Sequence, residues 1–193
     1  MKRNMKKIAS VLLVAMLALC LTACGGGKDN GGAVEIADAT EILTTVWGTY
    51  AEDEMFAAAG GDSENMSMEG PAKFDVSKTE ELAYLLNFPA ELADKIDDAA
   101  SLMHMMNANT FTAGAYHVAD AADMSAVVDA IKDKVMNNHW MCGFPEKIVI
   151  FNVNGGDYVV YAIGNGEAID YFKTQLTTVM GESAVVVTEE AVA

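Results

Sequence analysis

Two short stretches hold side chains whose types and spacing could do chemistry. In His139-Trp140-Met141-Cys142, an imidazole and a thiol are three residues apart. Such a pair could be a nucleophile with its base, or half of a zinc site. The second stretch is Met103-His104-Met105-Met106, and its thioethers and imidazole are ligands that suit Cu(I). The candidate metal ligands are therefore Met103, His104, Met105, Met106, His139 and Cys142.

Both stretches also have a simpler interpretation. Zinc needs further ligands, and the histidines are scattered singly along the chain. A nucleophilic cysteine needs a third group that orients its base, whereas a lone cysteine or methionine commonly fills a core. The sequence also contains no nucleotide-binding or hydrolase motif. We therefore predict no catalytic residues, no cofactor and no enzymatic activity, and keep copper handling as the alternative hypothesis.

Residues 51–75 are predicted to form a long acidic loop. The segment holds Glu52-Asp53-Glu54, Asp62 and Glu64, interrupted by glycines and a proline. Carboxylates could bind Ca²⁺, but the spacing of an EF-hand is missing. Loops of this length within a domain are usually functional or disordered, and the pattern does not choose between the two.

The N-terminus has the pattern of a cleaved export signal. Residues 1–7 carry four positive charges and no negative charge, and residues 8–21 are almost unbroken apolar sequence. That run is shorter than the roughly 20 residues that a spanning helix needs. The signal is therefore predicted to cover residues 1–23.

The end of this signal resembles the lipobox of bacterial lipoproteins. The matching residues are Leu21-Thr22-Ala23-Cys24, followed by three glycines. The resemblance implies cleavage before Cys24 and diacylglycerol on the Cys24 thiol. Each buried methylene of a lipid contributes about 0.8 kcal/mol, and two chains give stable retention. The sequence thus predicts an extracytoplasmic protein anchored to the cell membrane, with residues 24–37 as a flexible tether.

Charge restricts the partners of the mature chain. Removal of residues 1–23 leaves 170 residues with 8 Lys, no Arg and 28 acidic residues, a formal charge of −20. Such a surface repels phosphate backbones, so nucleic acid is excluded as a partner. Only Cys142 stays available as a thiol, which excludes an intrachain disulfide. The expected partners are the membrane, through Cys24, and a protein or small ligand.

Residues 38–180 are predicted to form one α+β domain. A helix begins at Asp38, where Glu41 completes a capping-box pattern, and Ser77 with Glu80 starts a second helix. A short helix follows Pro89, and further helical turns are expected over residues 97–106.

The C-terminal half has clearer periodicity. Strands are predicted over residues 111–118, 147–153 and 157–163, with helices over 122–136 and after Asn165. Asn154-Gly155-Gly156-Asp157 is typical of a tight hairpin turn. The β-α-β-β-α order predicts a small sheet with helices packed on one face. Residues 181–193 are expected to be a disordered or strand-like tail.

The order of these features resembles a group of small Firmicutes lipoproteins that share a domain of unknown function. The matching features are the 38–50 helix, Leu85-Leu86-x-Phe88-Pro89, the 111–118 strand, the amphipathic helix and the 148–163 hairpin. The resemblance implies the lipid anchor and the fold class, and no catalytic residues. We expect a non-enzymatic binding or accessory module with an exposed apolar or aromatic patch that involves Trp140 or Phe144.

Overall fold

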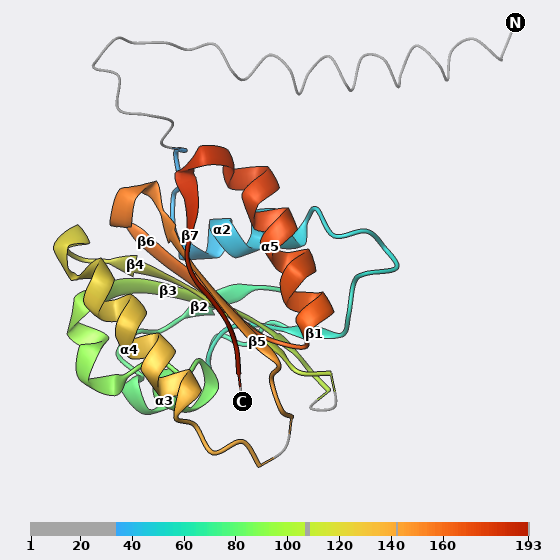
Figure 1. Ribbon diagram of the computed structural model, residues 1–193, viewed down its shortest axis with the longest axis horizontal. Helices are drawn as coiled ribbons and strands as arrows, with labels where there is room; N and C mark the ends of the chain where they lie inside the picture. The colour runs from blue at the N-terminus through green and yellow to red at the C-terminus, as the bar shows by residue number, and fades with distance from the viewer. Residues whose placement is uncertain (1–33, 107–108, 142, 193) are drawn as a thin grey trace, which may run out of the picture. The chain divides into compact units, whose positions relative to one another are not determined.

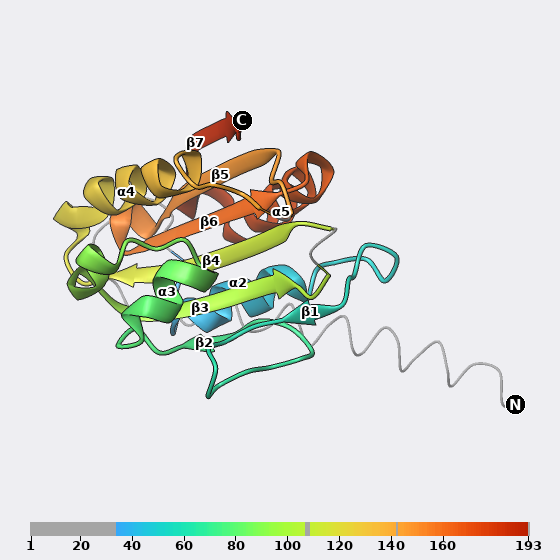
Figure 2. The ribbon, with the colours of Figure 1, turned by 90° about the horizontal axis from the view of Figure 1, so that it is seen from below.

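One antiparallel sheet runs through the residues that the computed structural model describes, which are 34–106, 109–141 and 143–192 (Figure 1). Its strands are β1 (Ala58–Ala59), β2 (Ala72–Phe74), β3 (Ile96–His104), β4 (Phe111–Val118), β5 (Lys147–Val153), β6 (Tyr158–Gly164) and β7 (Ala184–Ala191). Their spatial order is β1-β3-β4-β6-β5-β7, and β2 also pairs with β3 (Figure 2). The predicted leader 1–23, Cys24 and Cys142 lie outside the described residues.

In the part of the chain that the structure describes, four α-helices and several short 3₁₀ turns accompany the sheet. The α-helices are α2 (Ala39–Trp47), α3 (Thr79–Leu85), α4 (Met124–Met136) and α5 (Gly166–Met180), and a 3₁₀ helix, η1, spans Ala90–Lys95. Among the described residues, no helix is long and apolar enough to cross a membrane. The predicted α+β class is confirmed, and so is the β-α-β-β-α order of the C-terminal half.

Helices cover both faces of the sheet, so the prediction of helices on one face is wrong. Alternate residues of β5 and β6 enter two separate cores: Val149 and Val160 pack with α2 and α5, whereas Ile150 and Val159 pack with α3 and α4. Figure 1 shows α4 and α5 on opposite sides of the strands. The physical reason is visible in the strands themselves, because they are apolar at consecutive positions instead of alternating with polar residues.

Most of residues 97–106 belong to strand β3, so the prediction of helical turns there is wrong. β3 pairs with β4 along its length, from Ile96 opposite Val118 to Met103 opposite Thr112. Its middle is buried on both faces and rich in Ala, Leu and Met, which are good helix formers. The local preference for helix is therefore overridden by pairing on both sides of the strand.

The acidic segment 51–75 contributes an edge of the sheet, so the prediction of a plain loop is wrong in this respect. β1 and β2 both pair antiparallel with β3, and Gly60 and Ser67 form a bridge between them. A Cβ at Gly60 would lie 2.5 Å from the backbone nitrogen of Ala72 and from the carbonyl oxygen of Ser101. A side chain at position 60 would therefore collide with the backbones of β2 and β3, and only glycine fits there.

The predicted tail holds β7, which pairs with β5 and belongs to the same sheet. The domain therefore does not end at residue 180. At the other end of the predicted domain, the Val34 backbone nitrogen donates to Asn154 Oδ1 and to Ser183 Oγ, each at 3.2 Å. The last residues of the predicted tether 24–37 are thus part of the folded unit.

Local sequence signals explain several boundaries. The Glu41 backbone nitrogen donates to Asp38 Oδ1 at 2.8 Å, which confirms the predicted cap of α2. Gly155 adopts a φ of 72° in the predicted hairpin turn. The cap predicted at Ser77 is wrong, because its hydroxyl donates to Asp75 Oδ1 at 2.7 Å and α3 begins at Thr79.

Candidate functional site

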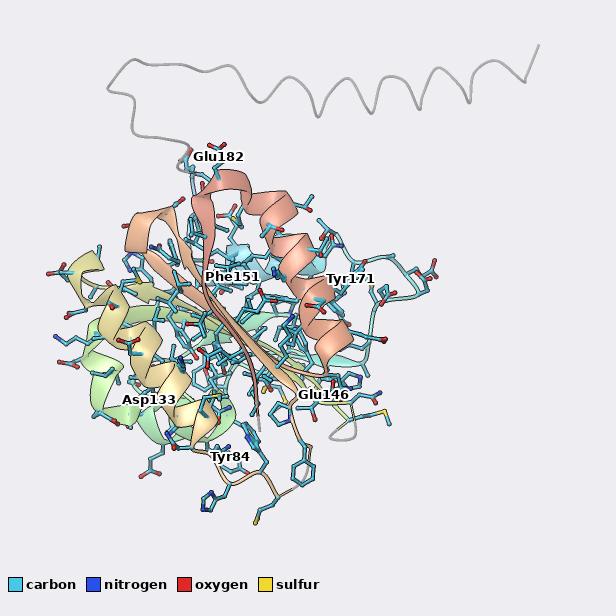
Figure 3. All side chains as sticks on the ribbon, viewed as in Figure 1. Tyr84, Asp133, Glu146, Phe151, Tyr171 and Glu182 are labelled. Carbon is cyan, nitrogen blue, oxygen red and sulfur yellow. The ribbon has the colours of Figure 1, made fainter. Side chains whose placement is uncertain are left out.

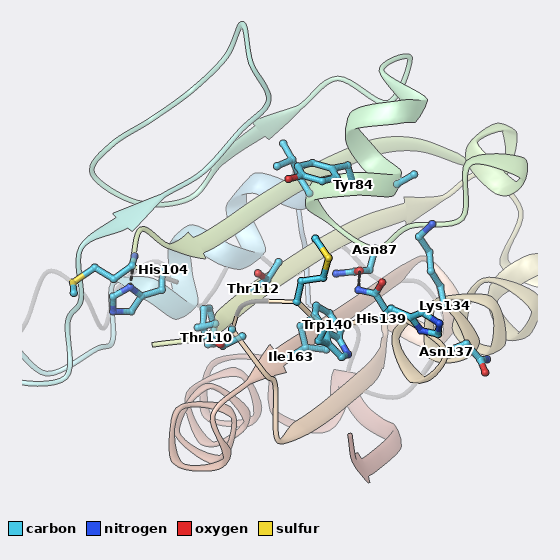
Figure 4. A pocket seen from close by; sticks show the side chains of 17 residues that line it. Tyr84, Asn87, His104, Thr110, Thr112, Lys134, Asn137, His139, Trp140 and Ile163 are labelled. Atoms are coloured by element: carbon cyan, nitrogen blue, oxygen red, sulfur yellow. Dashed lines mark hydrogen bonds between the residues drawn. The ribbon is translucent and has the colours of Figure 1, made fainter. Parts of the chain in front are cut away.

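A groove of about 670 Å³ lies between α3 and α4 on one face of the sheet. Its walls come from the end of α3, the end of α4, residues 137–141 and Gly143, and its floor comes from the ends of β4 and β6. It extends from His104 at one end to Lys134 and His139 at the other (Figure 4). Cavities of this size commonly hold small ligands.

Helix ends place the groove's polar walls. Asn87 follows α3 with a φ of 48°, the left-handed conformation in which helices often end on Gly or Asn. The carbonyl oxygen of Leu86 accepts hydrogen bonds from the hydroxyls of Tyr161 and, at 3.4 Å, of Tyr116. Burial raises the pKa of both tyrosines, so their hydroxyls stay protonated as donors. These bonds fix the end of α3 against the strands.

The lining contains no carboxylate. All seventeen lining residues are described, and none is Asp or Glu, although the chain has 28 acidic residues. Its polar lining residues include Asn87, Thr110, Thr112, Lys134, Asn137 and Asn138. Asn138 Nδ2 makes a long contact of 3.5 Å with Asn87 Oδ1 across the groove. The groove is thus a neutral to weakly positive region on a strongly acidic protein.

Apolar and aromatic side chains stand at the groove's rim. Tyr84 is 85% exposed and Met141 is 91% exposed, and both line the groove. Phe144, beside the lining residue Gly143, is 67% exposed. Trp140 is half-buried, and its Nε1 is buried without a hydrogen-bond partner in the described part of the chain. Exposed apolar and aromatic side chains therefore flank Trp140, as the predicted patch would require.

The strand conformation separates the two central copper candidates. Met103 packs with the core under α3 and α4, whereas the His104 ring stacks on Phe56 at 4.8 Å on the opposite face. His104 Nδ1 accepts a hydrogen bond of 2.9 Å from the Met106 backbone nitrogen, and burial lowers the pKa of His104. Met105 and Met106 are exposed. This geometry does not gather the four residues into one site.

The other proposed pair is only partly described. His139 is exposed at one end of the groove, and Cys142 lies outside the described residues. His104 and His139 both line the groove, but they stand at its two ends (Figure 4). Within residues 34–106, 109–141 and 143–192, no group of three His, Cys, Asp or Glu side chains could hold a metal ion.

The acidic segment is organised around one buried carboxylate. Asp62 accepts five hydrogen bonds, from Glu64 N, Asn65 N and Nδ2, Asp75 N and Lys78 Nζ. Burial acts to raise the pKa of Asp62, but these donors hold it well below the usual range. The Asp62 side chain is inaccessible to solvent and its lone pairs are occupied by donors. Its role is therefore structural, and it is no ligand for Ca²⁺ in this arrangement.

Sequence patterns singled out some of the groove's lining residues and missed the others. His104, Met106, His139, Trp140 and Met141 lie in stretches singled out by their residue types. The lining residues of α3, of β4 and of β6 come from distant parts of the sequence, and no local pattern marks them. Comparison of the chain with family models, with curated proteins and with solved structures finds no match.

Proposed function

We propose that the protein is an extracytoplasmic lipoprotein, held at the cell membrane through Cys24, whose domain binds a ligand in the groove between α3 and α4. The observation that carries the binding role is the groove's lining, which has no carboxylate on a protein of strongly negative charge. A surface that only faces solvent has no reason to lack carboxylates in one groove. A pocket that combines apolar walls with a few polar groups is the usual form of a binding site.

The position of the groove supports this role. Val34, the first described residue, is hydrogen-bonded to Ser183, and Glu182 beside it lies at the opposite end of the domain from Tyr84 (Figure 3). Cys24 precedes Val34 by ten residues in the sequence, so the tether would join the domain at the Val34 end and not at the groove. The groove would then be accessible to molecules of the cell envelope.

The geometry favours binding over catalysis. In the described residues, His104 Nδ1 accepts from the Met106 backbone nitrogen, and no carboxylate that could orient His104 or His139 lines the groove. The copper hypothesis gains no support either, because Met103 and His104 point to opposite faces of β3. A non-enzymatic binding or accessory module is therefore the function that the site supports best.

Two measurements test the proposal. Mass spectrometry of the protein extracted from its own membrane should find residues 1–23 removed and diacylglycerol on Cys24; an unmodified Cys24 would overturn the anchor. The immobilised protein should also retain envelope material in a groove-dependent way. We compare wild type with Tyr84→Ala/Asn138→Asp in the groove and with Val185→Ala/Val187→Ala, exposed residues of β7, as the matched control.

We expect the groove variant to lose the retained material and the β7 variant to keep it. Equal retention by all three proteins would mean that the groove is not the binding site. All four substituted side chains lie at the surface, so each variant should fold. Circular dichroism of each variant checks this and excludes a loss of folding as the cause.

A further inference from the structure

We infer that the groove binds an uncharged sugar chain; this inference rests on the proposed function and specifies its ligand. Charge gives the first argument. The mature chain has a formal charge of −20, so its field disfavours an anionic ligand. A cationic ligand would need a carboxylate partner, and the lining offers none. The lining is therefore matched to a ligand without net charge.

The side chains in the groove match the two kinds of surface on a sugar ring. A pyranose has flat faces of C–H groups, which pack on aromatic rings, and a rim of hydroxyls that donate and accept hydrogen bonds. Tyr84 and Trp140 supply rings at the groove wall. Asn137 and Asn138 supply amides. Asn137 Nδ2 already donates to the Asp133 carbonyl oxygen at 2.8 Å, so its Oδ1 and its second N–H remain for ligand hydroxyls, as do the corresponding groups of Asn138.

The elongated form of the groove indicates a chain and not a single small ring. The lining extends from the edge of the sheet at His104, whose ring lies on the other face of β3, to His139, and Thr110 and Thr112 lie between these ends (Figure 4). Hydroxyl-bearing side chains along the floor suit a ligand that has polar groups along its whole length. A compact apolar ligand would place apolar atoms against the Thr112 hydroxyl and the Asn138 amide, which also line the groove.

Peptides are a poorer fit for two structural reasons. A peptide that binds as an added strand needs an open sheet edge. The strand of the groove floor, β4, has none, because Thr112 is paired with Met103 of β3 on one side and with Ile163 of β6 on the other. A peptide that binds as an amphipathic helix needs an apolar groove, and this floor carries threonines instead.

The test uses the lipidated full chain in detergent micelles and defined sugar chains. Soluble chains of N-acetylglucosamine, β-linked glucose, α-linked glucose and mannose are titrated by calorimetry, up to about 10 mM, tenfold above a millimolar dissociation constant. An uncharged peptide and a lysine-rich peptide serve as alternative ligands. At least one sugar chain should bind, and its binding should alter the fluorescence of Trp140, which persists in Trp47→Phe, a variant of the chain's other tryptophan.

Variants connect the binding to the groove. Tyr84→Ala should weaken the sugar's affinity by about three- to tenfold, the usual contribution of one aromatic contact. Tyr84→Phe keeps the ring and should bind within about twofold of wild type, and Val185→Ala on β7 should bind as wild type does. Equal affinity of Tyr84→Ala and wild type would overturn the inference.

The possible failures are distinguishable. If no sugar chain binds, but envelope material is still retained in a groove-dependent way, the sugar inference is wrong and the proposed function stands. If only the uncharged peptide or the lysine-rich peptide binds, and Tyr84→Ala abolishes that binding, the sugar inference is again wrong and the proposed function again stands. If the groove variant retains envelope material as wild type does, the proposed function itself fails.

Discussion

Replacing Asp62 by Asn should destabilise the domain, because this carboxylate organises the acidic segment. Its Oδ1 accepts from Glu64 N at 2.9 Å, from Asn65 N at 3.2 Å and from Lys78 Nζ at 2.6 Å. Its Oδ2 accepts from Asn65 Nδ2 at 2.8 Å and from Asp75 N at 2.9 Å. An amide at this position places an N–H group against two or three donors, whichever way it is turned.

The magnitude follows from the number of donors left without an acceptor. With the amide nitrogen in the place of Oδ2, the donors from Asn65 and Asp75 lose their acceptor, and each such loss in a buried site costs about 1–3 kcal/mol. We therefore expect Asp62→Asn to lower the free energy of unfolding by about 3 kcal/mol. In a domain of this size that corresponds to a decrease in Tm of about 6–12 °C.

Urea denaturation followed by circular dichroism measures this loss. The matched control is Asp53→Asn, because Asp53 is an exposed carboxylate of the same segment, and this change should stay within about 0.5 kcal/mol of wild type. Refutation would come from Asp62→Asn with the same stability as Asp53→Asn, since the five donors would then have found other acceptors at no cost.

The pH dependence of the same variant tests the charge separately. The pKa of Asp62 in the fold lies below its ordinary value of about 3.9, so the carboxylate's contribution is fully present above about pH 4. It is lost as the pH falls through the depressed pKa of the folded state. The stability difference between wild type and Asp62→Asn should therefore be constant between about pH 5 and 7 and decrease below about pH 4. A difference that increases on acidification would contradict this assignment.

Two further predictions concern the core and the groove's end. Gly114→Ala should lower the free energy of unfolding by about 1–3 kcal/mol in urea denaturation, because its Cβ would lie 2.6 Å from Tyr161 Cε1 and 2.7 Å from Tyr116 OH; an unchanged midpoint would show that the tyrosines shift freely. His104 should titrate below the ordinary pKa of about 6.5 in an NMR titration, because it is partly buried against Phe56; a value at or above 6.5 would show that the ring leaves this stack.

The C-terminal half was predictable because its signals are local. Apolar positions repeat at helical spacing over 122–136, β-branched residues fill 147–153 and 157–163, and Asn154-Gly155 marks the turn between those strands. Each of these patterns is read within one element and needs no knowledge of its neighbours. The structure has the same elements in the same order.

The N-terminal half was harder because its strands depend on one another. β3 has the composition of a helix, and it is a strand because β4 pairs with one side and β1 and β2 pair with the other. β1 and β2 have two and three residues, too few for any periodicity to appear. Without β3 as a strand, the acidic segment could be read only as a loop.

The groove arises from where two helices end, and the same residues explain both the ends and the lining. α3 stops at Leu85 because Asn87 adopts the left-handed conformation and Pro89 follows two residues later. α4 stops at Met136, before Asn137 and Asn138. Residues that terminate helices are often Asn, and here their amides remain beside the uncovered ends of β4 and β6. Helix termination thus leaves a part of the sheet face open and supplies its hydrogen-bonding groups in one step. The sequence could indicate each helix end, but only the fold brings the two ends together across one face of the sheet.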